Sequence, residues 1–153
     1  LQDAQGNTVL LYTADVTATL VVGTGTLRGV TISAAVAGVH SFVGLNIDLV
    51  GTDKVISFSS NELYVSSSVH TVRHGEAAVL SIRTQPGGTP VYTAFAPQPS
   101  IVVRDGSTNT VVSSSLVITV SIAQGLGAVL GTTLATAVAG IATFTNLQVT
   151  LVD

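Results

Sequence analysis

The chain has 153 residues, of which 46% are apolar and only 8% are charged, and its net charge is −3. Five Lys and Arg residues provide no basic patch for nucleic acid, and the absence of Cys excludes disulfides and thiolate metal sites. No apolar run reaches the roughly 18 residues of a membrane-spanning helix. A chain rich in Val, Thr, Ser and Gly, with few residues suited to helix surfaces, is predicted to be all-β.

The first predicted elements are a turn and a strand. Residues 3–7, Asp-Ala-Gln-Gly-Asn, have the composition of a turn. Ala14, Val16, Ala18 and Leu20 then alternate with polar residues. This period of two is typical of a strand that buries one face.

Three glycines, Gly23, Gly25 and Gly29, follow this strand. Their spacing is similar to that of a dinucleotide-binding loop, and Asp48 follows about 20 residues later. Such a loop must open a helix, whose N-terminus holds the pyrophosphate, whereas residues 30–32 are the strand-like Val-Thr-Ile. We therefore expect the glycines to form a bend between strands, and no cofactor to bind.

The next strand is predicted after Gly38. Phe42 lies on the even phase of this segment, whereas Leu45 and the apolar residues after it lie on the odd phase. The change of phase at residues 43–44 indicates a bulge or a short bend. We predict that Phe42 and Leu45 belong to the core and that Gly38 is a structural glycine.

A hairpin and two further strands are predicted in the middle of the chain. Residues 54–60 and 63–73 form the hairpin, with its turn at Ser-Ser-Asn. We predict the domain junction at residues 74–76. The strands 78–83 and 101–103 follow, separated by a segment that contains all four prolines.

The rest of the chain repeats its beginning. Shifted by 102 positions, residues 3–50 fall on residues 105–152 without a gap, and 17 of the 48 pairs are identical. Gly140, Phe144 and Leu147 take the places of the glycine and the two core residues named above, so we predict the same roles for them. A period of about 102 residues is a usual size for an immunoglobulin-like β-sandwich.

The segment 51–104 occurs only once, so it must close the first copy and open the second. We therefore predict that residues 1–73 are an immunoglobulin-like repeat lacking its opening strands. Residues 74–153 are then a repeat lacking its closing strands. Incomplete sandwiches leave apolar strand edges unpaired, so we expect either a longer parent chain or neighbouring chains that complete the sheets.

Few residues are candidates for catalysis or metal binding. His70 and His74 would lie roughly 13 Å apart on a strand, too far to share a zinc ion. Asp53, Glu76 and Asp105 are the carboxylates available for calcium at the domain junction, although the chain has no dense acidic run. It also has neither an adjacent acidic pair nor a Gly-x-Ser-x-Gly elbow. We predict no enzyme, no metal and no cofactor.

Two serine runs are candidates for O-linked glycosylation, and no Asn-x-Ser/Thr sequon is present. The candidate residues are Ser66, Ser67, Ser68, Ser113, Ser114 and Ser115.

Several stretches resemble known repeats. Residues 3–9 and the Ala-Gly-Val-x-x-Phe at 37–42 resemble the tandem bacterial Ig-like repeats of invasin and intimin type. Residues 82–86, 95–105 and 140–147 are similar to a related repeat of very long surface proteins of bacteria and algae. The resemblance implies a sandwich fold, tandem arrays and work as a spacer, fibre or adhesin stalk. It carries no catalytic residue.

One turn departs from this pattern. Residues 105–109 read Asp-Gly-Ser-Thr-Asn, where the repeats usually have Asp-x-x-Gly-Asn, and this leaves the conformation of the turn open.

The sequence thus predicts a structural module of an extracellular filament, cell-surface or appendage protein. Modules linked in series form a stiff rod, and low charge removes repulsion between neighbouring rods. We expect neighbouring repeats of the same protein as partners, and self-association into a fibre. The alternative is an adhesin module that binds a glycan or a host protein through its loops.

Overall fold

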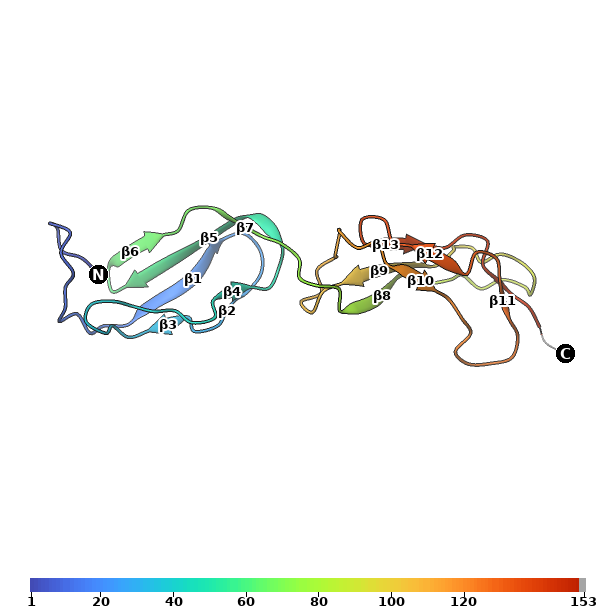
Figure 1. The fold of residues 1–153 in the computed structure, drawn as a ribbon, viewed down its shortest axis with the longest axis horizontal. Coiled ribbons are helices and arrows are strands. Elements are labelled where there is room, and N and C mark those ends of the chain that lie inside the picture. Colours follow the sequence, from blue (N-terminus) through green and yellow to red (C-terminus); the bar gives the residue numbers. More distant parts are fainter. Residues whose placement is uncertain (152–153) are drawn as a thin grey trace. The chain divides into compact units, whose positions relative to one another are not determined.

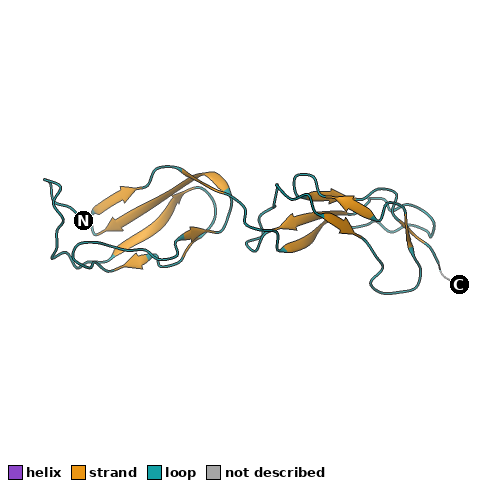
Figure 2. Cartoon of the chain, viewed as in Figure 1, coloured by secondary structure: helices purple, strands orange, loops and turns teal. Residues whose placement is uncertain are grey.

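The computed structural model describes residues 1–151, which form β-strands joined by turns and loops (Figures 1 and 2). Within these residues there is no helix, and every strand pair is antiparallel. The prediction of an all-β fold is therefore confirmed. The chain divides into two compact units, Leu1–Arg73 and His74–Asp153.

The first unit contains a five-stranded sheet and a two-stranded sheet. In the larger sheet the strand order is β3-β1-β5-β6, and β7 also pairs with β5. In the smaller sheet β2 pairs with β4. The strands are β1 (Val16–Val22), β2 (Leu27–Arg28), β3 (Ile32–Ser33), β4 (Asn46–Ile47), β5 (Gly51–Ser60), β6 (Leu63–Ser66) and β7 (His70–Val72).

The strand β1 follows the predicted alternation. Val16 and Ala18 are buried, with 9% and 3% of their surfaces exposed. The strand ends before Gly23, which together with Gly25 and Gly29 has a positive φ, between 89° and 113°. The three glycines lie in the segments that connect β1, β2 and β3, so the predicted bend between strands is confirmed. Residues with side chains rarely adopt a positive φ, which is why these positions are glycines.

The predicted hairpin is present, with its turn at Asn61 (φ 53°), but residues 63–73 are not a single strand. They divide into β6 and β7, and both pair with β5. Ser67 separates them: its Oγ accepts a hydrogen bond from the N–H of Ile56 at 3.0 Å and donates to the carbonyl of Ser68 at 2.9 Å. A side chain that bonds to nearby backbone interrupts the regular ladder.

The second unit contains three small sheets. Their strand orders are β13-β9-β8, β10-β12 and β11-β14. The strands are β8 (Val79–Thr84), β9 (Ser100–Arg104), β10 (Val117–Thr119), β11 (Val129–Leu130), β12 (Leu134–Thr136), β13 (Ile141–Thr143) and β14 (Gln148–Val149).

Strand pairs in the two units correspond at a shift of 102 positions. Val16 pairs with Ser33 in the first unit, and Ile118 pairs with Ala135 in the second. The same shift relates the β2–β4 pair to the β11–β14 pair, residue by residue. Within residues 1–151, the strands β5 to β9 have no such counterpart.

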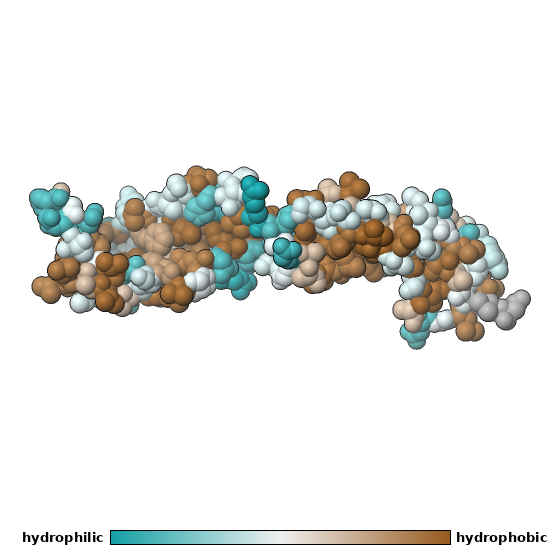
Figure 3. Space-filling model, viewed as in Figure 1, coloured by the Kyte–Doolittle hydropathy of each residue, from teal (hydrophilic) through white to brown (hydrophobic). Residues whose placement is uncertain are grey.

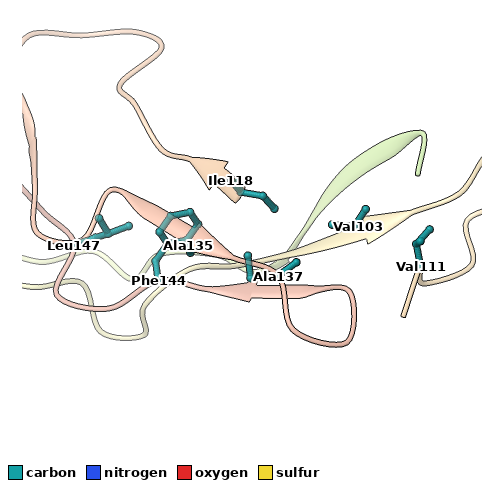
Figure 4. Packing of buried hydrophobic residues seen from close by; sticks show 8 residues of the cluster. Val103, Val111, Ile118, Ala135, Ala137, Phe144 and Leu147 are labelled. Atoms are coloured by element: carbon teal, nitrogen blue, oxygen red, sulfur yellow. The ribbon is translucent and has the colours of Figure 1, made fainter. Parts of the chain in front are cut away.

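The core of the second unit lies between its sheets (Figure 4). Phe95, Ile101, Val120 and Val129 pack against it while remaining partly exposed. The buried residues of this core cluster are Val103, Val111, Ile118, Ala135, Ala137, Ala142, Phe144 and Leu147.

Candidate assembly surface

The residues predicted as core lie at different depths in the two units. Phe144 and Leu147 are almost completely buried, with 2% and 0% of their surfaces exposed. Phe42 and Leu45, which occupy the matching places in the first unit, are only half-buried. The first unit therefore covers its aromatic side chain less completely than the second unit does.

The predicted structural glycines Gly38 and Gly140 are both buried, with φ angles of 73° and 75°. A Cβ atom on Gly38 would lie 2.4 Å from the carbonyl oxygen of Val9, and one on Gly140 would lie 2.6 Å from that of Val111. These positions need glycine both for the left-handed backbone and for the close approach of another segment.

Asp105 organises the turn that departs from the repeat pattern. Its Oδ1 accepts hydrogen bonds from the N–H groups of Ser107 and Asn109, both at 2.9 Å, and its Oδ2 accepts one from Gly75 at 2.8 Å. The Gly75 N–H, followed by the Asn109 side chain, lowers the pKa of Asp105 to about 2. The oxygens of Asp105 thus hold the turn together.

The turn keeps one geometry in both units. Asp3 accepts hydrogen bonds from Gln5 and Asn7, both at 2.9 Å, and these bonds lower its pKa, the Asn7 N–H most strongly. Gly6 has a φ of 85° and Thr108, at the matching place, has a φ of 70°. Thr108 is therefore forced into a conformation that suits glycine.

Asp48, which follows β4, bonds to residues at β2 and so connects these two strands; it is not part of a phosphate-binding loop. Its Oδ1 accepts the N–H of Thr26 at 2.7 Å, and its Oδ2 forms an ion pair with Arg28 at 2.8 Å. The Thr26 N–H and then the Arg28 hydrogen bond lower the pKa of Asp48. In the second unit Thr150 accepts the N–H of Ala128 in the same way, at 3.0 Å.

The other polar candidates lie apart within their units. His70 is in β7 and contacts the Ser68 carbonyl at 3.0 Å, whereas His74 lies 3.3 Å from the hydroxyl of Ser113. Asp53 and Glu76 are both exposed. Among residues 1–151, no group of three His, Cys, Asp or Glu side chains is placed to hold a metal ion.

The two serine runs lie on exposed segments, but not all of their hydroxyls are free. Besides Ser67 in the first run, Ser114 in the second is engaged, because its Oγ accepts the N–H of Leu116 at 3.4 Å. Ser66, Ser68, Ser113 and Ser115 are exposed, although the Ser113 hydroxyl also lies 3.3 Å from His74 Nε2. They are the more accessible positions for a glycosyltransferase.

Sequence reasoning did not single out Lys54, which is completely buried in β5. Its Nζ donates to the carbonyl of Thr24 at 2.5 Å, which fastens the glycine bend to β5. A Cβ atom on Gly23 or on Gly51 would lie 2.7 Å from the Lys54 side chain. The sequence signal is a charged residue in a predicted strand, three positions after Gly51.

Apolar surface remains exposed in both units (Figure 3). In the second unit a groove of about 440 Å³ runs beside β8 and β10, and its lining includes Leu80, Ile118 and Phe144. In the first unit a groove of about 670 Å³ is lined by residues that include Phe42 and Leu63. Soluble monomers rarely expose large contiguous apolar patches, so these grooves are candidate interaction sites.

Each groove borders a segment that pairs with fewer strands than the segment at the matching place, 102 positions away, in the other unit. In the second unit, β10 pairs only with β12 among residues 1–151, whereas β1 pairs with both β3 and β5. In the first unit, residues 39–41 form no strand, whereas β13 pairs with β9. Each groove therefore lies where the other unit has strands.

No protein-family model matches the chain, and neither a curated protein nor a solved structure matches it. Across residues 1–151, no helix is long and apolar enough to cross a membrane.

Proposed function

We propose that the chain is a structural module of an extracellular filament, cell-surface or appendage protein. It acts as a stiff spacer and assembly unit. The observation that carries this proposal is the pair of apolar grooves beside incompletely paired segments, one in each unit. Unpaired strand edges are templates for pairing with another chain, and an assembly unit needs such surfaces.

The proposal includes a tandem immunoglobulin-like architecture with a period of about 102 residues. It is supported by the strand pairs that recur at this shift and by the matching turns at Asp3 and Asp105. Repeats in series form a quasi-one-dimensional array in which each module contacts its neighbours. The length of such an array grows with the number of modules, which is what a spacer requires.

Composition also suits close packing between chains. With 8 acidic and 5 basic residues in 153, the surface generates little long-range repulsion. Its exposed polar groups are mainly hydroxyls, which hydrogen-bond to neighbours or to water without the desolvation cost of charges.

Assembly of the purified chain tests this proposal. We expect sedimentation velocity to show species that grow with concentration, and negative-stain electron microscopy to show elongated particles. Thr119→Lys places a charge on the exposed edge strand β10 and should suppress growth. Thr145→Lys, at an exposed position outside the strands, is the matched control and should leave it unchanged. A strictly monomeric chain at all concentrations would count against the proposal.

The adhesin alternative is favoured by one observation. Tyr92 lies in a loop with 61% of its surface exposed and a φ of 60°, and exposed tyrosines are frequent at binding hot spots. A glycan array and a panel of host surface proteins should then retain the chain, and Tyr92→Ala should abolish retention. If nothing on either panel is retained, this alternative fails.

A further inference from the structure

The edge of β10 that faces away from β12 adjoins the groove of the second unit. Leu80, Ile118, Val120 and Phe144 line that groove, and Leu80 is 53% exposed. The counterpart of β10 in the first unit, β1, has this same edge covered by β5. The chain therefore contains, in its first unit, a template for what covers the groove in its second.

Backbone geometry at this edge suits a strand ladder. Val120 donates its N–H to the carbonyl of Thr133 at 3.0 Å, on the β12 side. Because successive residues of a strand direct their backbone groups to opposite edges, Thr119 and Ser121 direct theirs toward the groove side. Ala18 of β1 likewise donates its N–H away from β5, to the carbonyl of Thr31 at 2.7 Å. Thr17 and Thr19, which lie opposite Ser59 and Ser57, therefore direct their backbone groups toward β5.

We propose that the groove of the second unit is a strand-acceptor site, and that its occupant is an extended segment with the sequence pattern of Gly51–Ser60. This inference rests on the proposed function and names the chemistry of the partner. Shifted by 102, the register of β1 with β5 places the incoming equivalents of Phe58 and Ile56 opposite Val120 and Ile122. Directly opposed residues share one face, so both incoming side chains enter the groove.

The aromatic side chains support this register. In the first unit the Phe58 ring lies 5.1 Å from the Phe42 ring at an interplanar angle of 54°. Phe144 takes the place of Phe42 in the second unit and lines the groove. An incoming phenylalanine would reproduce this pair, and aromatic pairs at such distances attract beyond their area burial.

The occupant is a separate segment and is not the β5 strand of a second copy. Within the first unit, β5 already pairs with three strands: β1, β6 and β7. Releasing it would break these ladders and expose the buried Lys54. A strand of the same pattern from another segment carries no such cost.

A labelled peptide of residues 51–60 tests the proposal against the full chain by fluorescence anisotropy. We expect saturable binding. In β5, the N–H and carbonyl of Ile56 bond to Ser67, on the β6 side. The backbone groups of Ser57 and Ser59 therefore point toward β1. N-methylation of Ser57 and Ser59 should therefore weaken binding at least about tenfold. N-methylation of Ile56 and Phe58 leaves the ladder groups intact and should change it less than about threefold.

Variants of the chain locate the site. Val120→Asp should abolish peptide binding, while Val112→Asp, at a position that is 58% exposed and outside the groove, should not. Absent binding, or an equal loss with both N-methylated peptides, would overturn the proposal. Assembly without peptide is scored separately, so filaments that form while the peptide fails to bind leave the proposed function standing.

Discussion

Replacing Phe144 by Ala is expected to destabilise the second unit by about 3–5 kcal/mol, the range for a large aromatic deleted from a packed core. The side chain is 2% exposed and packs in the cluster with Ile118 and Leu147. Phe42 is the matched residue of the first unit, but it is only half-buried beside a groove. Phe42→Ala should therefore destabilise its own unit by less, about 1–3 kcal/mol.

The assay must resolve the two units, because a chain with two units need not unfold in one step. Amide hydrogen exchange followed by nuclear magnetic resonance reports the opening free energy of each unit separately. In Phe144→Ala the exchange of β9 and β13 should accelerate while that of β1 and β5 stays unchanged. A loss below about 1 kcal/mol for Phe144→Ala, or a larger loss for Phe42→Ala, would refute the assigned core.

Three further changes have defined outcomes. Thr108→Gly should raise the stability of the second unit by about 1 kcal/mol in thermal unfolding, since it relieves a left-handed φ of 70° that Gly6 adopts freely. Asp105→Asn should lower the melting temperature at pH 7. Because the folded pKa of about 2 lies below the ordinary 3.8, the advantage of the carboxylate is present above pH 4, and the two melting temperatures should converge as pH falls toward 2. Gly140→Ala should cost at least about 2 kcal/mol, because its Cβ would lie 2.6 Å from a carbonyl oxygen. Gly106→Ala, with open space around it, should stay within about 0.5 kcal/mol in the same chemical denaturation experiment.

Patterns local to the sequence were sufficient for the strand class and for the glycine bends. Alternation predicted the buried face of β1, at Val16 and Ala18. The spacing of Gly23, Gly25 and Gly29 indicated a bend, and all three have a positive φ. These features are predictable because each depends on the residue's own backbone preference or on one periodic face.

Other features depend on contacts that no local pattern encodes. The alternation from Leu116 to Ile122 predicts a strand as long as β1, but β10 covers only Val117–Thr119. A strand with a partner on one edge has fewer ladder bonds to hold its ends. The burial of Lys54 depends on a pocket made by a distant carbonyl, that of Thr24. The grooves depend on which strands pair, and the pairing of segments far apart in the chain is not encoded in a local pattern.

The strand β10 lacks the residues that usually protect an exposed sheet edge. Natural sheets blunt exposed edges with lysine, proline, bulges or inward charges, yet the sequence of β10 is Val-Ile-Thr, and the residues on either side, Leu116 and Val120, are apolar too. Only its short length protects it. By contrast, β8 carries Arg83 along its own edge. A strand acceptor requires an unprotected edge beside an apolar groove. A charged side chain on that edge should prevent another strand from pairing with it. Thr119→Lys therefore reports on the same edge in two ways: it should stop assembly and weaken the binding of the peptide of residues 51–60, whereas an edge that serves only as a surface would leave peptide binding unaffected.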